Sequence, residues 1–338
     1  VIIDCFVTLM VDSFMADKGA LKSRIVESFK RLEAETLIQK NGEEYDFLTN
    51  AEQDVNKQIN NTAYNEAEVQ RTILEIIYDK IFEGNKYRYE GHYDFALNRF
   101  VDEECKGSIS QNGLTVRVRT QFSGTRAASE FQAESVREGA IIIDLTEGTF
   151  VSELILANKI GTYRRINSAS MSASLTEIMT KKSAEAAERT KRAEELIRAS
   201  LRNAPIYLAG TQLDIRQKDG KERMMDALKE MVKRDYFKIG LVIGFYNDQR
   251  AVYSMLTESD ITFTGLNDDD NKGAYEEILD KLRDDKRVMR TTTVKSLLDY
   301  FSKKPYGWRD LDILGMIGRM WKFNAIQIMI HEIGRAHV

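Results

Sequence analysis

The sequence predicts a helix-rich α+β fold, with winged-helix-like units at both ends around a small α/β region and a long charged helix. Two observations carry this prediction. Apolar residues recur at helical spacing along much of the chain, and short strand-like runs interrupt them near residues 36–48, 114–144 and 325–330. The 338 residues are 43% hydrophobic and 30% charged with two prolines, a composition typical of globular, helix-rich proteins rather than disordered ones.

Residues 1–60 are predicted to form the first winged-helix-like unit. A helix near 20–35 is indicated by one apolar stripe, made of Leu21, Ile25, Val26, Phe29 and Leu32. Two strand-like runs then flank Asn41-Gly42, a pair that accepts the positive φ angles of a tight hairpin. A helix followed by a two-stranded wing is the winged-helix arrangement. Asn50 is expected to cap the next helix, with Gln53 at the capping-box position.

Residues 61–150 are predicted to hold a helix at 66–83 and a small α/β region. The run Leu114–Thr120 alternates apolar and polar residues, as a half-buried strand does. The run Gly139–Asp144 predicts a fully buried strand.

Residues 151–259 are predicted to contain a helix near 151–166, a Ser/Ala-rich connection and a helix of about thirty residues ending before Pro205. A hairpin at Ala209-Gly210 and a helix near 221–235 follow. The thin alanine seam of the long helix indicates that it needs a packing partner, which we expect within an assembly.

Residues 260–331 are predicted to form the second winged-helix-like unit. A loop at 260–273 precedes helices near 274–287, 293–302 and 309–323 and a strand at 325–330. Between two of these helices lies a structural turn of four residues, Pro305, Tyr306, Gly307 and Trp308. Proline fixes φ, glycine permits the reversal, and the aromatic rings are expected to anchor the turn against adjacent helices.

Both ends of the sequence indicate an internal fragment. The chain begins at Val1 inside an apolar run, and 332–338 read like the translation of a sequencing adapter. We therefore set residues 332–338 aside from the fold prediction. The apolar run is too short for a membrane span, and we expect a cytoplasmic protein with no membrane contact.

The sequence predicts no catalytic, cofactor-binding or metal-binding residues. A phosphate loop requires Gly-x-x-x-x-Gly-Lys-Ser/Thr, and the nearest candidate, Gly220-Lys221, has Ile215 and Glu222 at required positions. Asp144 could end a Walker-B strand, but an ordinary core strand is the better interpretation without a phosphate loop. Cys5 and Cys105 lie far apart without a partner motif, which favours reduced structural thiols.

Basic side chains are the candidate contacts to nucleic acid or to a partner. The net charge of −4 excludes a globally basic coat protein but not a local basic face. The candidates are Lys22, Arg24, Lys30, Arg31, Lys40, Arg164, Arg165, Lys181, Lys182, Arg189 and Arg192. Glutamates share both segments, so the alternative is a solvated helix with ion pairs such as Glu185–Arg189 and Glu188–Arg192.

Two tracts, Phe47–Asn56 and Lys304–Trp308, are similar in this order to the P-loop ATPases of BREX bacteriophage-defence systems, the BrxC/PglY family. Further similar tracts are Tyr93–Asp102, Leu114–Val116 and Ile206–Leu208, so the resemblance covers most of 20–330. It implies an AAA-type parent ATPase that uses ATP and Mg²⁺ and acts with other BREX components. None of that family's nucleotide-binding residues matches a position in this chain.

Three functions remain open. The chain could be a non-catalytic fragment of a BREX ATPase that supplies oligomer, partner or DNA contacts. It could instead be a stand-alone winged-helix DNA-binding regulator, for which salt-dependent DNA affinity within residues 1–60 would be diagnostic. A structural scaffold subunit would show self-association and no DNA affinity.

Overall fold

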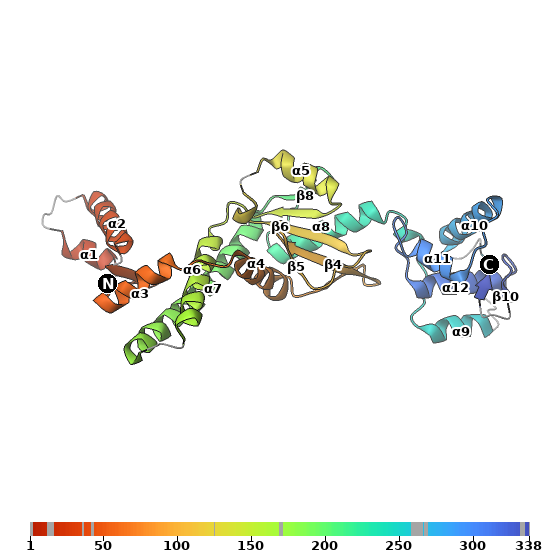
Figure 1. Cartoon of the computed structure of the whole chain (residues 1–338). Helices are drawn as coiled ribbons and strands as arrows, with labels where there is room; N and C mark the ends of the chain where they lie inside the picture. The colour runs from red at the N-terminus through yellow and green to blue at the C-terminus, as the bar shows by residue number, and fades with distance from the viewer. Residues whose placement is uncertain are drawn as a thin grey trace.

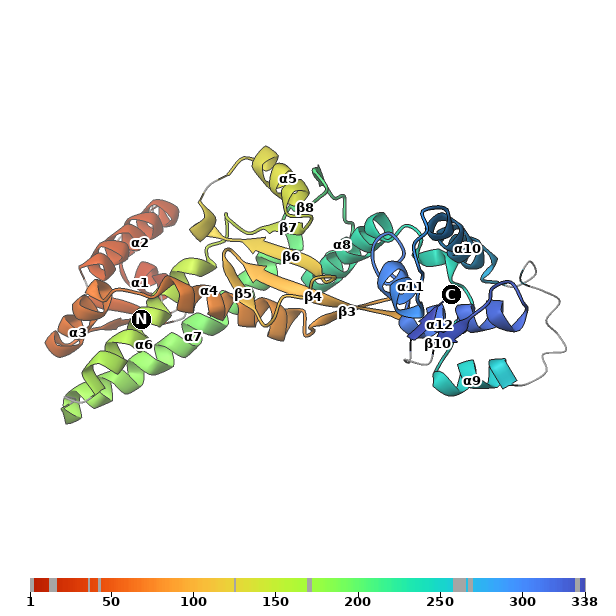
Figure 2. The same ribbon diagram turned by 45° about the vertical axis from the view of Figure 1, so that its right-hand side comes forward.

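The computed structural model describes residues 3–11, 17–35, 37–41, 44–124, 126–168, 172–257, 266, 270–331 and 335–337. Three parts follow one another in a row, an N-terminal unit, a central sheet domain and a C-terminal helical unit (Figures 1 and 2). Helices dominate and a mixed sheet lies at the centre, so the predicted α+β class is confirmed.

The N-terminal unit contains the helix and hairpin that the sequence predicts. Its elements are α1 (Ile3–Leu9), α2 (Lys18–Ala34), β1 (Ile38–Asn41), β2 (Glu44–Phe47) and α3 (Asn50–Asn61). The predicted cap of α3 was wrong by one residue. Thr49 is the N-cap, and Glu52 completes the capping box because its carboxylate accepts from the Thr49 backbone N–H at 2.9 Å.

The central domain starts with α4 (Glu66–Glu75), which continues as the π-helix η1 (Ile76–Ile81). A seven-stranded sheet follows in the order β3-β4-β6-β7-β8-β9, with β5 paired to β4. The strands are β3 (Lys86–Tyr89), β4 (Tyr93–Val101), β5 (Glu104–Lys106), β6 (Leu114–Arg119), β7 (Ile141–Asp144), β8 (Ile206–Leu208) and β9 (Thr211–Gln212). The pairs β4–β6 and β6–β7 are parallel, and the other pairs are antiparallel.

Helices cover both faces of this sheet. Successive side chains of β7 point to opposite faces and therefore enter different cores. Ile141 and Ile143 enter a large core shared with α4, η1, α7 and α8, whereas Ile142 packs with Phe131 of α5 (Ala128–Arg137). Figure 1 shows α5 on the side of the sheet opposite to α4. The buried strand predicted at 139–144 and the half-buried strand at 114–120 are both present.

A long helical hairpin leads away from the sheet toward the N-terminal unit (Figure 1). It consists of α6 (Phe150–Asn167) and α7 (Ala173–Asn203), and α8 (Gly220–Asp235) follows β9. Our expectation that α7 finds its partner elsewhere in an assembly was wrong, because α6 packs along it within the same chain. Ala193 and Ile197 of the thin seam are buried in the central core, as is Leu201 of the same helix.

The C-terminal unit contains the three predicted helices and one that the sequence did not predict. The elements are η4 (Ile239–Leu241), α9 (Gln249–Thr257), α10 (Lys272–Arg287), α11 (Val294–Phe301), α12 (Asp310–Lys322), β10 (Met329–His331) and β11 (Arg335–His337). The strand begins at Met329 rather than at 325, and residues 335–337, which we had set aside, pair with it. Most of the predicted 260–273 loop lies outside the described residues.

Candidate functional site

The fold gathers five candidate cations from two distant segments into one groove. The groove has a volume of about 870 Å³ and lies between the β1–β2 hairpin, the start of α3 and α7. Its cations are Lys40, Lys181, Lys182, Arg189 and Arg192. Asp46, Glu52, Glu185 and Glu188 line the same groove. Positive and negative groups are nearly balanced, so the groove lacks the single-sign potential that attracts phosphates.

Lys182 connects α7 to the N-terminal hairpin rather than facing solvent. This side chain is buried, and its Nζ donates to Glu185 Oε2 at 2.8 Å and to the side-chain oxygen of Gln39. The Gln39 Nε2 in turn donates to Glu185 Oε2 at 2.7 Å. A buried charge that is paired in this way holds two elements in register, and its removal from the pair is costly.

Arg189 extends the same network from α7 to α6. Its Nε donates to Glu185 Oε1 at 2.8 Å, and its Nη1 donates to Glu153 Oε2 at 2.9 Å. Burial pushes the pKa of the Glu185 carboxyl up. The charges and hydrogen bonds of Lys182 and Arg189 outweigh this effect, so the pKa lies below the usual range for glutamate. Glu185 is therefore ionised at neutral pH and fully engaged.

The remaining cations of the long hairpin also contact groups of this chain. Arg165 donates twice to the Glu68 carboxylate, at 3.3 Å each, and Arg164 donates to Ser183 Oγ at 3.3 Å. Lys181 lies 3.5 Å from Glu52. The predicted pair Glu185–Arg189 forms, but Arg192 contacts Glu153 at 3.5 Å instead of the predicted Glu188.

The candidate cations of the N-terminal unit do not converge on one surface. At about 100° per residue, Lys22 and Lys30 lie on one side of α2, and Arg24 and Arg31 lie on the other. Lys22 pairs with Asp4 at 2.6 Å and Arg31 pairs with Glu27 at 3.7 Å. Lys40 lies over the Tyr45 ring, 5.8 Å from its centroid.

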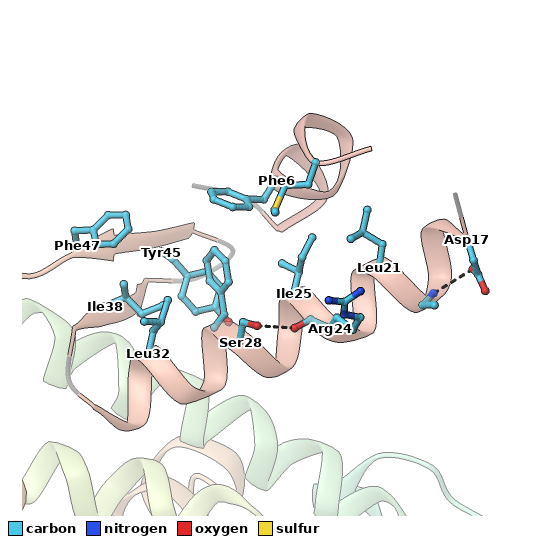
Figure 3. Close-up of a pocket in the computed structure, with 13 residues that line it drawn as sticks. Phe6, Asp17, Leu21, Arg24, Ile25, Ser28, Leu32, Ile38, Tyr45 and Phe47 are labelled. Carbon is cyan, nitrogen blue, oxygen red and sulfur yellow. Dashed lines mark hydrogen bonds between the residues drawn. The ribbon is translucent and has the colours of Figure 1, made fainter. Parts of the chain in front are cut away.

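An apolar pocket of about 680 Å³ lies between α1, α2 and β2, and the sequence did not predict it (Figure 3). Leu21 and Ile25 line it from α2, and Phe6 lines it from α1. Phe47 on its rim is 77% exposed. The apolar stripe of α2 and the hairpin were both predicted from the sequence, but the pocket between them and α1 was not.

The Pro305–Trp308 turn lies where the C-terminal unit meets the end of α8. Gly307 has a φ of +66°, and a Cβ there would lie 2.5 Å from Tyr236 Cδ1. The Trp308 ring stacks on Phe301 at 4.8 Å, and its Nε1 donates to the Lys238 carbonyl at 3.0 Å. The Pro305 carbonyl accepts from the Lys238 N–H at 3.0 Å. The turn therefore contacts the segment that follows α8 as well as the helices around it.

Comparison with known families assigns the two larger parts of the chain. Residues 62–231 match the fourth domain, with a six-stranded β-sheet, of the BREX ATP-binding protein BrxC. The chain belongs to the BrxC family. Residues 238–333 match the winged helix-turn-helix domain of the same protein, which confirms the predicted C-terminal winged helix and extends it toward the N-terminus. No solved structure matches the chain. Membership of the BrxC family gives the protein a role in BREX phage defence.

Phe245 joins the two BrxC-family domains. Its ring packs against the cores of both. The His92 ring of the β3–β4 turn stacks on one side at 3.9 Å, and the Arg309 guanidinium lies 5.1 Å from the ring centroid. Tyr93 Oη donates to the Ile239 carbonyl at 3.2 Å. The His92 loop therefore takes part in the contact between the two domains.

A buried ion network at the carboxyl ends of β4 and β6 is a second feature that sequence reasoning missed. Arg119 donates from Nε to Glu134 Oε1 at 2.9 Å and from Nη1 to Glu103 at 2.8 Å. Arg126 also donates to Glu134. Both Arg119 and Glu134 are buried, and each has opposite charge beside it. The network holds α5 and the β6–α5 loop against the sheet.

The described part of the chain offers little for metal chemistry or membrane insertion. Across the described ranges, no three of its histidine, cysteine, aspartate and glutamate side chains group so as to hold a metal ion. No helix within those ranges is long and apolar enough to cross a membrane. Asp144 accepts from the Thr146 N–H at 2.9 Å and from its hydroxyl at 2.6 Å, which is a local turn contact.

Proposed function

We propose that this chain is a non-catalytic part of a BREX ATP-binding protein and acts through protein contacts rather than by binding DNA. The supporting observation is the internal pairing of the cations that DNA would need. Lys182 and Arg189 bind carboxylates of this chain in largely buried pairs, whereas the pair of Arg165 with Glu68 is exposed. A protein that neutralises phosphates must release such cations, and breaking a buried pair is costly.

The joint, by which we mean the contacts between the sheet domain and the winged-helix domain, also supports this proposal. Lys304 pairs with Asp235 at the end of α8, so an ion pair accompanies the Phe245 stack at the joint. Lys238 and Glu277 form a further pair within the winged-helix domain. The sheet domain and the winged helix are thereby held as one piece. A rigid unit of this kind can transmit a movement from one protein partner to another, as expected of a region attached to an ATPase.

In this proposal ATP and Mg²⁺ belong to the nucleotide-binding core of the parent protein, and this chain supplies no ligand to them. The partners are other BREX components or further copies of the same protein, and the setting is the cytoplasm. The alternative of a stand-alone winged-helix DNA-binding regulator requires a basic reading surface, and the candidate cations of the N-terminal unit do not converge on one. The second alternative, a structural scaffold subunit, also acts through protein contacts and is therefore favoured over the regulator.

Fluorescence anisotropy with a labelled 30-base-pair duplex tests the proposal on the whole chain. We expect an affinity no better than about 10⁻⁴ M near physiological salt, the weak end of non-specific binding. The matched control is Lys182→Met, which removes a buried cation and should leave this weak binding unchanged. Tight binding that falls about a thousandfold or more between 50 and 200 mM salt would refute the proposal and favour the regulator.

A further inference from the structure

Helix α9 packs on the side of α12 that faces away from the core of the winged-helix domain. The core side of α12 carries Ile313, Met316, Ile317 and Met320. The opposite side carries Gly315, Gly318 and Lys322, at about 180° from the core side when each residue turns the helix by about 100°. A Cβ at Gly318 would lie 3.1 Å from Leu256 and 3.4 Å from Met255 of α9. Lys322 Nζ donates to the Met255 carbonyl.

The covered side of α12 is the side that a DNA-reading winged helix would present to DNA. α12 is the second helix of the α11–α12 helix–turn–helix and precedes the β10–β11 hairpin, so it occupies the position of the recognition helix. Gly315 and Gly318 carry no side chain that could reach a base edge. Tyr246 packs over Gly315, and α9 approaches closely over Gly318. This surface is therefore built for helix packing.

α9 itself is held less firmly than α12. Within the described helix Gln249–Thr257 no residue is fully buried, and Tyr253 is 68% exposed. The segment before α9 is fixed independently of it. Asp312 Oδ1 accepts from the Tyr246 N–H at 2.9 Å, and Arg309 donates to the Tyr246 carbonyl at 2.9 Å. The surface beneath α9 can therefore persist when α9 leaves.

We propose that this side of α12 is a helix-binding seat, defined by Gly318 and Lys322, and that α9 is a self-ligand which an amphipathic helix of a partner protein replaces. α9 shows which helix fits, one with large apolar side chains over Gly318. Its last turn must also reach Lys322, because a cation there binds the free carbonyls of a helix C-terminus. Leu314 and Trp321 are exposed beside the seat and enlarge the apolar contact for a longer helix. This proposal rests on the proposed function, for which it names the kind of partner.

The test uses the whole chain and a fluorescein-labelled, helix-stapled peptide with the sequence of residues 249–257. Leu256→Asp weakens the self-ligand, so this variant should bind the peptide at least about tenfold more tightly than the wild type, where α9 competes. Adding Gly318→Leu fills the seat and should abolish the binding. The control Tyr253→Asp changes an exposed position of α9 and should behave like the wild type.

Three results would contradict the proposal that α12 carries a helix-binding seat. The first is a folded Leu256→Asp variant that does not bind the peptide, and the second is binding that survives Gly318→Leu. The third is a gain of salt-dependent DNA binding by Leu256→Asp, which would mean that α9 masks a nucleic-acid surface. DNA binding by the wild type would instead refute the proposed function itself, so the two failures are distinguishable.

Hydrogen exchange on the wild type keeps the proposal testable if Leu256→Asp does not fold. A replaceable α9 opens locally, so its amides should exchange at least about tenfold faster than those of α12. Equal protection of the two helices would show that α9 is an integral part of the domain and would overturn the proposal.

Discussion

Replacing Gly307 by alanine tests how closely the Pro305–Trp308 turn must approach the end of α8. Two costs add at this position. The backbone has a φ of +66°, and an L-residue with a side chain pays about 1–2 kcal/mol in this left-handed region. The new Cβ would also lie 2.5 Å from Tyr236 Cδ1, and Tyr236 is buried. Forcing an extra carbon into a packed site costs about 1–3 kcal/mol more.

We therefore expect Gly307→Ala to lower the free energy of unfolding of the winged-helix domain by about 2–5 kcal/mol. Guanidinium unfolding followed by tryptophan fluorescence measures this, because both tryptophans, Trp308 and Trp321, lie in that domain. Circular dichroism on the same samples checks whether the sheet domain unfolds in the same transition, as a shared joint predicts.

Gly139→Ala is the matched control for the backbone cost alone. Gly139 has a φ of +56°, and a Cβ there would meet nothing within 4 Å. Its loss should be about 1–2 kcal/mol, followed by circular dichroism because both tryptophans lie in the winged-helix domain. Equal losses for the two variants would refute the reasoning, because the close contact with Tyr236 would then contribute nothing.

Three further predictions concern single side chains. Arg223 is buried and donates to the Arg202 and Ala204 carbonyls at the end of α7, so Arg223→Met should cost about 1–3 kcal/mol in thermal or chemical unfolding. Phe245→Ala should leave both domains folded but loosen their joint, seen as faster proteolysis between residues 242 and 248 and a larger radius of gyration in small-angle scattering; an unchanged cleavage rate would contradict this role. The folded-state pKa of Glu185 is depressed, so its contribution to stability is present above the unfolded value of about 4.3 and is lost as pH falls through the lower folded value. Glu185→Gln should remove this acid sensitivity, and an unaltered pH profile of unfolding would argue against the Lys182–Glu185–Arg189 network.

Local patterns in the sequence predicted the elements of the fold well. α2, α7 and α10 have long apolar periodicities, and the two strands of the predicted hairpin are present, whereas its Gly42 lies outside the described residues. The nine residues of α9 were not predicted to be helical. The N-cap error, Asn50 for Thr49, arose because both side chains can cap and only the Glu52 contact distinguishes them.

The candidate site was harder to predict because charge pairing depends on distant segments. Arg189 contacts Glu153 across 36 residues, and Arg192 contacts Glu153 across 39 residues. A sequence shows how many cations a helix carries but not which carboxylates the fold brings to them. The same holds for the joint, where His92, Phe245 and Arg309 come from three separate segments.

The central claim is that this chain works through protein contacts, and co-elution with purified BREX components tests it most directly. Size-exclusion chromatography with light scattering should be run in 0.5 M NaCl after nuclease treatment, since high salt and nuclease remove bridging by DNA. We predict a complex of defined stoichiometry, either with a BREX component or between copies of this chain, that persists under these conditions. A chain that elutes as a monomer in every mixture, or a complex that disappears with nuclease, would contradict the account.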